Sequence, residues 1–246
     1  MNLWFTMFKR IAIVLAMTML VGCSTNSEKN IASLLKEKYN KDFCVELTRP
    51  GDGYKTALCF EYDNPDIRFE ATLDNKTKLL RDDYALKCLD AHIAEEIGSD
   101  ITDMDGNYAI KVTGSTDIQF DSDPGITLEK YNSILKDKNL YNTRWTKIVC
   151  CLSTKEFTED DFYNVAETCL NKRDIGSGTI SIYLVSPSDI QEIKDLMRTT
   201  YRLNDSFDYV VMSAPKVQVL FEDNKLKYDE NTIKDLISTD GYFHEP

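Results

Sequence analysis

The sequence has few of the residues from which metal and cofactor sites are usually built. Its 246 residues include two histidines, His92 and His244, and no Cys-x-x-Cys pair, so zinc ligands are scarce. It also contains neither the Gly-x-Gly-x-x-Gly fingerprint nor the phosphate-binding loop that ends in Gly-Lys-Ser/Thr. We therefore expect no metal, no cofactor and no catalytic residue, and we favour a protein that is not an enzyme.

Positive charge is also scarce. The chain has 29 Lys and Arg against 41 Asp and Glu, a formal net charge of −12. Nucleic acid binding depends on cationic side chains that neutralise phosphates, so we expect no nucleic acid partner. Electrostatic adhesion to anionic lipid needs basic clusters too, so any attachment to a membrane has to come from elsewhere.

An apolar stretch near the start is too short to span a bilayer. Lys9-Arg10 precedes the apolar run Ile11 to Leu20, and the small residue Gly22 precedes Cys23. A membrane-spanning helix needs about 20 apolar residues. Basic residues, a short apolar run and a small residue before a cleavage point are typical of a secretory signal.

The four residues Leu20-Val21-Gly22-Cys23 resemble the lipobox of bacterial lipoproteins. The resemblance implies cleavage before Cys23, a diacylglyceryl group on the Cys23 sulfur and often an acyl chain such as palmitate on the new amine. More than one chain is needed for stable anchoring, and diacylglycerol supplies two. We therefore expect a lipid-anchored protein on the extracytoplasmic face of the cell membrane.

The remaining chain is long enough for two domains. Removing the predicted signal peptide, residues 1–22, leaves 246 − 22 = 224 residues. Residues 23–30 form the lipidated cysteine and a short linker. The polar stretch from Asp117 to Gly125 suggests a boundary, which divides the rest into residues 31–122 and 123–246.

The first part alternates in the manner of a one-sided antiparallel sheet. A helical apolar stripe covers residues 31–40, and period-two alternation predicts strands at residues 43–47, 58–62 and 67–73. A helix capped by Asp82 or Asp83 then runs to about Ile97. The pattern predicts a helix, an antiparallel meander and a second helix, with a further hairpin around Asp105-Gly106-Asn107.

This helix–meander–helix stretch runs from Lys36-Glu37-Lys38-Tyr39 through Asp63-Asn64-Pro65-Asp66-Ile67 to Arg81-Asp82-Asp83-Tyr84. It resembles a unit in uncharacterised exported proteins of Gram-positive bacteria. The resemblance covers about a third of the chain and implies no activity.

The turn between the first two strands allows a prediction about cysteines. If it centres near Gly51, Phe43 faces Phe60, and Cys44 faces Cys59 on the other side of the sheet. Cys44 and Cys59 could then form one disulfide, with the four later cysteines as free thiols. The alternative, in which all six cysteines after Cys23 are thiols, remains open.

The second part alternates helices and strands. The predicted helices begin near residues 128, 158, 186 and 231, and the predicted strands cover residues 145–152, 179–185, 209–212 and 217–221. The 145–152 strand is continuously apolar towards its end, which indicates burial on both faces. The fold class is α+β: a helix, a meander and a helix, followed by an alternating β/α half that resembles a sandwich.

Three motifs have simpler explanations than catalysis. Asp103 to Asn107 places its glycine too early for a calcium loop, so it predicts a turn. Gly176-Ser177-Gly178 runs from a helix to a strand, unlike a nucleophile elbow. Asp82-Asp83 and Asp160-Asp161 stand at helix starts, where the helix dipole favours negative charge.

Two functions remain. The first is a lipid-anchored cell-surface module that binds a protein, a peptide or an envelope component. The alternative is a lipid-anchored hydrolase that acts on envelope glycans or peptides through Asp and Glu residues brought together by folding. A pocket with two converging carboxylates would favour the hydrolase, and a groove would favour binding. A solute receptor is a weaker third hypothesis.

Overall fold

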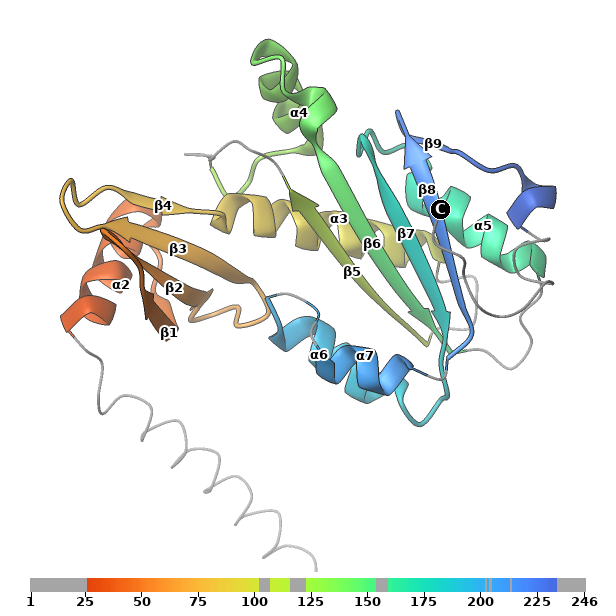
Figure 1. Ribbon diagram of the computed structural model, residues 1–246, viewed down its shortest axis with the longest axis horizontal. Helices are drawn as coiled ribbons and strands as arrows, with labels where there is room; N and C mark the ends of the chain where they lie inside the picture. The colour runs from red at the N-terminus through yellow and green to blue at the C-terminus, as the bar shows by residue number, and fades with distance from the viewer. Residues whose placement is uncertain are drawn as a thin grey trace, which may run out of the picture.

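The fold is α+β, as predicted. In this computed structural model the described residues are 26–101, 107–115, 123–153, 159–201, 203, 205–212 and 214–233. They form a four-stranded antiparallel sheet and a five-stranded mixed sheet, and a long helix contacts both (Figure 1). The lipobox with Cys23, Asp103 to Gly106 and His244 lie outside the described residues.

The first sheet is the predicted meander with one added strand. Its elements are α2 (Asn26–Tyr39), β1 (Phe43–Pro50), β2 (Tyr54–Glu61), β3 (Arg68–Asp74) and the short β4 (Leu80–Asp82), which was not predicted. Their inner faces bury aromatic and aliphatic side chains, among them Ile31, Leu35, Phe43, Phe69 and Tyr84.

The predicted register of this meander is wrong by one residue. Cys44 lies opposite Phe60, and Val45 lies opposite Cys59. Because strand neighbours alternate between faces, Cys59 points into the core and Cys44 points outwards, and both are free thiols. The cause is the turn: Pro50 pairs with Lys55, so the turn centres between Asp52 and Gly53 rather than near Gly51. A bulge between Val45 and Leu47 then shifts the pairing back by one residue. Because their side chains lie on opposite faces of the sheet, Cys44 and Cys59 do not form the predicted disulfide in this structure.

Helix α3 (Tyr84–Ile101) joins the two halves. Its start is capped as predicted, because an Asp82 carboxylate oxygen accepts a hydrogen bond from the Tyr84 N–H at 3.2 Å. Tyr84 belongs to the first core, whereas Leu89, Ile93 and Ile97 belong to the core of the second half. One helix therefore supports both sheets.

The second sheet has the order β5-β6-β7-β8-β9. Only β6 and β7 are parallel, and the strands are β5 (Tyr108–Ser115), β6 (Trp145–Leu152), β7 (Ser177–Leu184), β8 (Lys216–Glu222) and β9 (Lys225–Leu226). The other helical elements of this half are α4 (Leu128–Asp137), the 3-10 turn η1 (Tyr141–Thr143), α5 (Glu159–Leu170), α6 (Ile190–Thr199) and α7 (Asp205–Val211).

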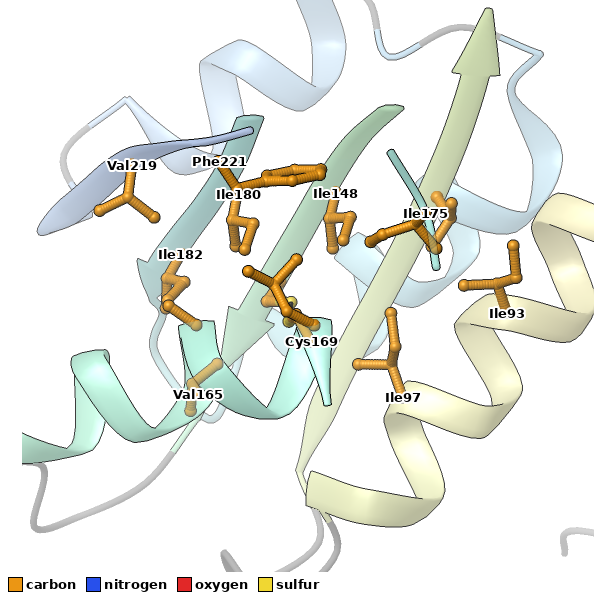
Figure 2. Close-up of a cluster of buried hydrophobic side chains, with 14 of the residues drawn as sticks. Ile93, Ile97, Ile148, Val165, Cys169, Ile175, Ile180, Ile182, Val219 and Phe221 are labelled. Carbon is orange, nitrogen blue, oxygen red and sulfur yellow. Dashed lines mark hydrogen bonds between the residues drawn. The ribbon is translucent and has the colours of Figure 1, made fainter. Parts of the chain in front are cut away.

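Helices cover both faces of this sheet (Figure 1). Side chains of α3 and α5, including Ile97, Val165 and Cys169, pack on one face with Ile148 and Ile180 (Figure 2). Side chains of α6 and α7 pack on the opposite face. β6, which was predicted to be buried on both faces, lies between these two cores.

Two expectations for this half are corrected. Strand β5 was assigned to the first domain, but it pairs with β6, so the division between the sheets does not coincide with the predicted boundary at residues 122 and 123. Residues 209–212, predicted as a strand, belong largely to α7. Phe207 and Val211 are buried there at an i, i+4 spacing, and this contact with the sheet determines the helix.

The last predicted helix begins as expected, since residues 230–233 are helical; its continuation is outside the described residues. Across the described ranges, no helix has the length and apolar character needed to cross a membrane.

Candidate functional site

A groove runs along the outer edge of β5, between α3 and α6, and we call it the β5 groove. Its volume is about 460 Å³, within the range of ligand-binding pockets. Its lining comes from β5, from flanking side chains of α3, from α6 and the residues after it, and from the start of β3: Asp66, Ile67, Arg68, Lys87, Asp90, Ala91, Ala94, Glu95, Gly98, residues 108–113, Gln191, Lys194, Asp195, Met197, Arg198, Thr200 and Tyr201.

The groove exists because β5 is an edge strand. Within the described residues, β5 has a neighbour on one side, β6. The ladder with β6 includes Asn107 O, which accepts from Ser153 N at 2.8 Å, so the odd-numbered residues bond to β6. The backbone groups of Tyr108, Ile110 and Val112 consequently point into the groove.

Asp90 blocks one end of this edge. One carboxylate oxygen accepts from the Gly114 N–H at 3.0 Å, and the other pairs with Lys87 Nζ at 3.0 Å. Asp90 is buried within an otherwise apolar helix face. Burial raises the pKa of Asp90, while Lys87 and the Gly114 N–H oppose that shift.

Lys111 points to the wall formed by α6. Its Nζ donates to the carbonyl oxygens of Met197 and Thr200, each at 2.6 Å, at the helix end where the dipole favours a cation. Burial, with a smaller effect from the positive charge of Lys87, lowers the pKa of Lys111 to about 8. The ammonium is therefore held on a face of β5 and leaves the strand edge uncovered.

Two side-chain contacts close the groove against the first sheet. The Tyr201 hydroxyl donates to an Asp83 carboxylate oxygen at 2.7 Å, and the other Asp83 oxygen accepts from Glu70 N at 2.7 Å. Arg198 pairs with Asp66 at 3.1 Å. Burial raises the pKa of Asp83, with opposition from Lys87 and the Tyr201 hydroxyl. These contacts fix α6 and its following residues beside β3.

Arg68 places a partly buried cation in the lining of the same groove. Its guanidinium pairs with Glu46 and lies 5.1 Å from the centre of the Phe60 ring. The Arg68 Nε is buried, and no hydrogen-bond acceptor for it exists within the described part of the chain. An unsatisfied buried donor is costly, so a ligand acceptor at this position would be stabilising.

Most of the carboxylates that line the groove are engaged in structural contacts. Of the four carboxylates that line it, Asp90 uses both of its oxygens in the contacts above, and Asp66 and Asp195 both pair with Arg198. A general acid or base needs an oxygen within hydrogen-bond reach of substrate. What the groove offers is a row of backbone hydrogen-bonding groups between two helical walls.

The residues singled out from the sequence lie elsewhere. Cys44 and Cys59 belong to the first sheet, away from this edge. His92 pairs with Glu96 on the exposed side of α3, and its neighbour Cys88 packs against the first core. Gly176, with a φ of 79°, directly precedes β7, and Ser177 and Gly178 are the first two residues of that strand. Within the ranges described above, no three His, Cys, Asp or Glu side chains are grouped to hold a metal ion.

Comparison with known proteins gives a fold and no activity. No protein-family model matches the chain, and no curated protein matches it. Among solved structures, the chain is similar to a DUF5037 family protein from Ruminococcus gnavus, with a TM-score of 0.66 and 15% sequence identity. The match covers 87% of this chain and 100% of that one, so the α+β arrangement is shared over nearly the whole length.

Proposed function

We propose that the protein is a lipid-anchored surface module that binds a protein or peptide partner in the β5 groove. The observation that carries this proposal is the groove itself: an unpaired strand edge enclosed by two helices. The lipobox resemblance and the acidic composition support the location. The hydrolase alternative gains no support from the groove, because three of its four carboxylates, Asp66, Asp90 and Asp195, are engaged in ion pairs.

The binding part is tested by photo-crosslinking in cells. Glu95 is an exposed residue on the groove rim, and Glu192 is an exposed residue of α6 that does not line the groove. With benzoylphenylalanine in place of Glu95, we expect a crosslinked product that is missing when the same group replaces Glu192. Equal labelling at both positions, or labelling at neither, would contradict the proposal.

The anchoring part has a separate test. Cys23→Ala should prevent lipid attachment and release or mis-sort the protein, and a block of prolipoprotein processing should leave a larger precursor. If Cys23→Ala protein stays in the membrane at unchanged size, and the natural chain takes up no lipid label, the lipoprotein hypothesis is wrong.

A further inference from the structure

The backbone groups on the edge of β5 that faces away from β6 have the spacing needed to pair with another strand. Residues 108–113 of β5 all line the groove, and the outward groups recur every second residue, about 7 Å apart. The Ile110 and Val112 N–H groups point away from β6, and no described strand pairs with β5 on that side. A peptide in extended conformation presents its own N–H and C=O groups at the same interval.

Helices α3 and α6 limit the space beside β5. Sheets pack strands about 4.8 Å apart in the hydrogen-bonding direction, and residues of α3 and α6 both line the groove along β5. Helix α3 approaches β5 closely near Tyr108, since a Cβ on Gly98 of α3 would lie 2.8 Å from the Tyr108 ring. Because helices line the groove along β5, we take a single extended chain, rather than the sheet edge of a second copy of this protein, as the occupant.

The charged side chains of the groove indicate which side chains the bound segment has. Arg68, Lys87 and Lys111 are close enough that Lys87 and Arg68 both act electrostatically on Lys111. The groove lining as a whole has five basic and four acidic side chains, so it is slightly positive on a protein with a net charge of −12. Lys87 and Lys111 already have acceptors, whereas the buried Arg68 Nε has none within the described chain. A carboxylate would complete this end of the groove.

We propose that the β5 groove binds an extended acidic segment of another protein, which adds to β5 as an extra strand. Its backbone bonds to Ile110 and Val112, and one carboxylate meets Arg68. This inference rests on the proposed binding function and names its partner class and binding mode.

Selection from a library of random displayed dodecapeptides provides the probe. We expect the selected peptides to be rich in Asp and Glu and to bind the mature protein. Methylating alternate backbone nitrogens of the best peptide, on the side that faces β5, should weaken binding at least tenfold, while methylation on the opposite side should have little effect. This comparison leaves the protein unchanged and is independent of any folding defect.

Protein variants test the two contacts. Ile110→Pro removes an outward N–H without touching a bond to β6 and should weaken binding at least tenfold, whereas Ile110→Val should bind as the natural chain does. Arg68→Gln should weaken binding of acidic peptides, whereas Glu46→Gln, which breaks the same ion pair but keeps the guanidinium, should not. Thermal melts establish that each variant is folded.

The results separate this inference from the proposed function. An empty selection, peptides indifferent to Ile110→Pro and to backbone methylation, or selected peptides without acidic residues would overturn the strand-addition inference. If crosslinking from position 95 still occurs in cells, the binding function stands with a different binding mode. Self-association through β5, seen as a dimer abolished by Ile110→Pro, would overturn the choice of partner.

Discussion

The four edge strands of the two sheets are protected to very different degrees. β1 carries a bulge and ends at Pro50, β4 has three residues, and β9 has two. Short strands, bulges and proline are the common protections against unwanted pairing. β5 is eight residues long and pairs with β6 along its whole length without a bulge. The protein thus blunts three edges and leaves the fourth regular, between two helices.

The difference shows that neighbouring elements restrict pairing with the β5 edge, whereas bulges, proline or short length restrict pairing with the other three edges. At one end Asp90 takes the Gly114 N–H, and beside the strand Lys111 is tied to α6. Both are polar groups buried at a cost. Their contacts shape the groove. Substitutions in the groove can therefore be compared with substitutions in the sheet interior and at the opposite edge.

The largest expected effect lies in the sheet interior. A Cβ on Gly178 would lie 1.7 Å from the carbonyl oxygen of Thr146 on β6, so Gly178→Ala must force the central parallel strands apart. We expect a loss of about 4 kcal/mol or more in the free energy of unfolding, measured by urea denaturation. Ser177→Ala, one residue away, should cost under about 1 kcal/mol; equal losses would show that the close approach is not what matters.

The next effect concerns the blocked end of the edge. Asp90→Ala leaves the Gly114 N–H and the Lys87 ammonium without their partner in a buried position. Breaking a buried pair in this way typically costs 3–5 kcal/mol, so we expect a loss of about 3 kcal/mol. Glu95→Ala, at an exposed position of the same helix, should change the free energy of unfolding by less than about 0.5 kcal/mol. A similar, small change for both variants would contradict the role given to Asp90.

The third effect depends on pH. The pKa of Lys111 is about 8 in the folded protein against an ordinary 10.5, so the unfolded chain binds this proton more tightly. Between pH 8 and 10.5 the free energy of unfolding should therefore rise with pH, by at most about 1.4 kcal/mol per unit from this group. Below pH 8 the contribution is constant. The rise is found by subtracting the profile of Lys111→Met from that of the natural chain, and parallel profiles would contradict the buried ammonium.

The smallest effect is expected at the opposite edge. Leu226 lies opposite Phe221 on β9, and Leu226→Pro removes a donor from an edge of two residues. It should leave the affinity for selected peptides within about twofold of the natural chain. A loss as large as that of Ile110→Pro would show that the two edges are not distinct in binding.

Much of the fold was predictable because its signals are local. The period-two runs at residues 67–73 and 145–152 and the helical stripe of Phe162, Val165 and Cys169 coincide with observed elements. The exact centre of the turn after Pro50 and the bulge after Val45 have no comparable signal, and together they set a register that differs from the predicted one. α7 also escaped prediction, because the sheet face that orders it is formed by distant strands.

The groove was not predicted, for a similar reason. Lys111 in an apolar strand and Asp90 beside the apolar stripe of α3 were the only local signs, and each could equally have been a solvated side chain. Their significance depends on β5 being an edge of the second sheet, which follows from pairing with β6 across residues 116–144. No spacing within a single element reveals that pairing.

Site-resolved amide hydrogen exchange on the mature protein, with and without a selected acidic peptide, tests strand addition to β5 most directly. In the free protein the Ile110 and Val112 amides should exchange faster than those of Ala109 and Lys111, which bond to β6. With peptide bound, the Ile110 and Val112 amides should slow at least tenfold, and the Leu226 amide should not change. Unchanged exchange at Ile110 and Val112 under saturating peptide would contradict the account.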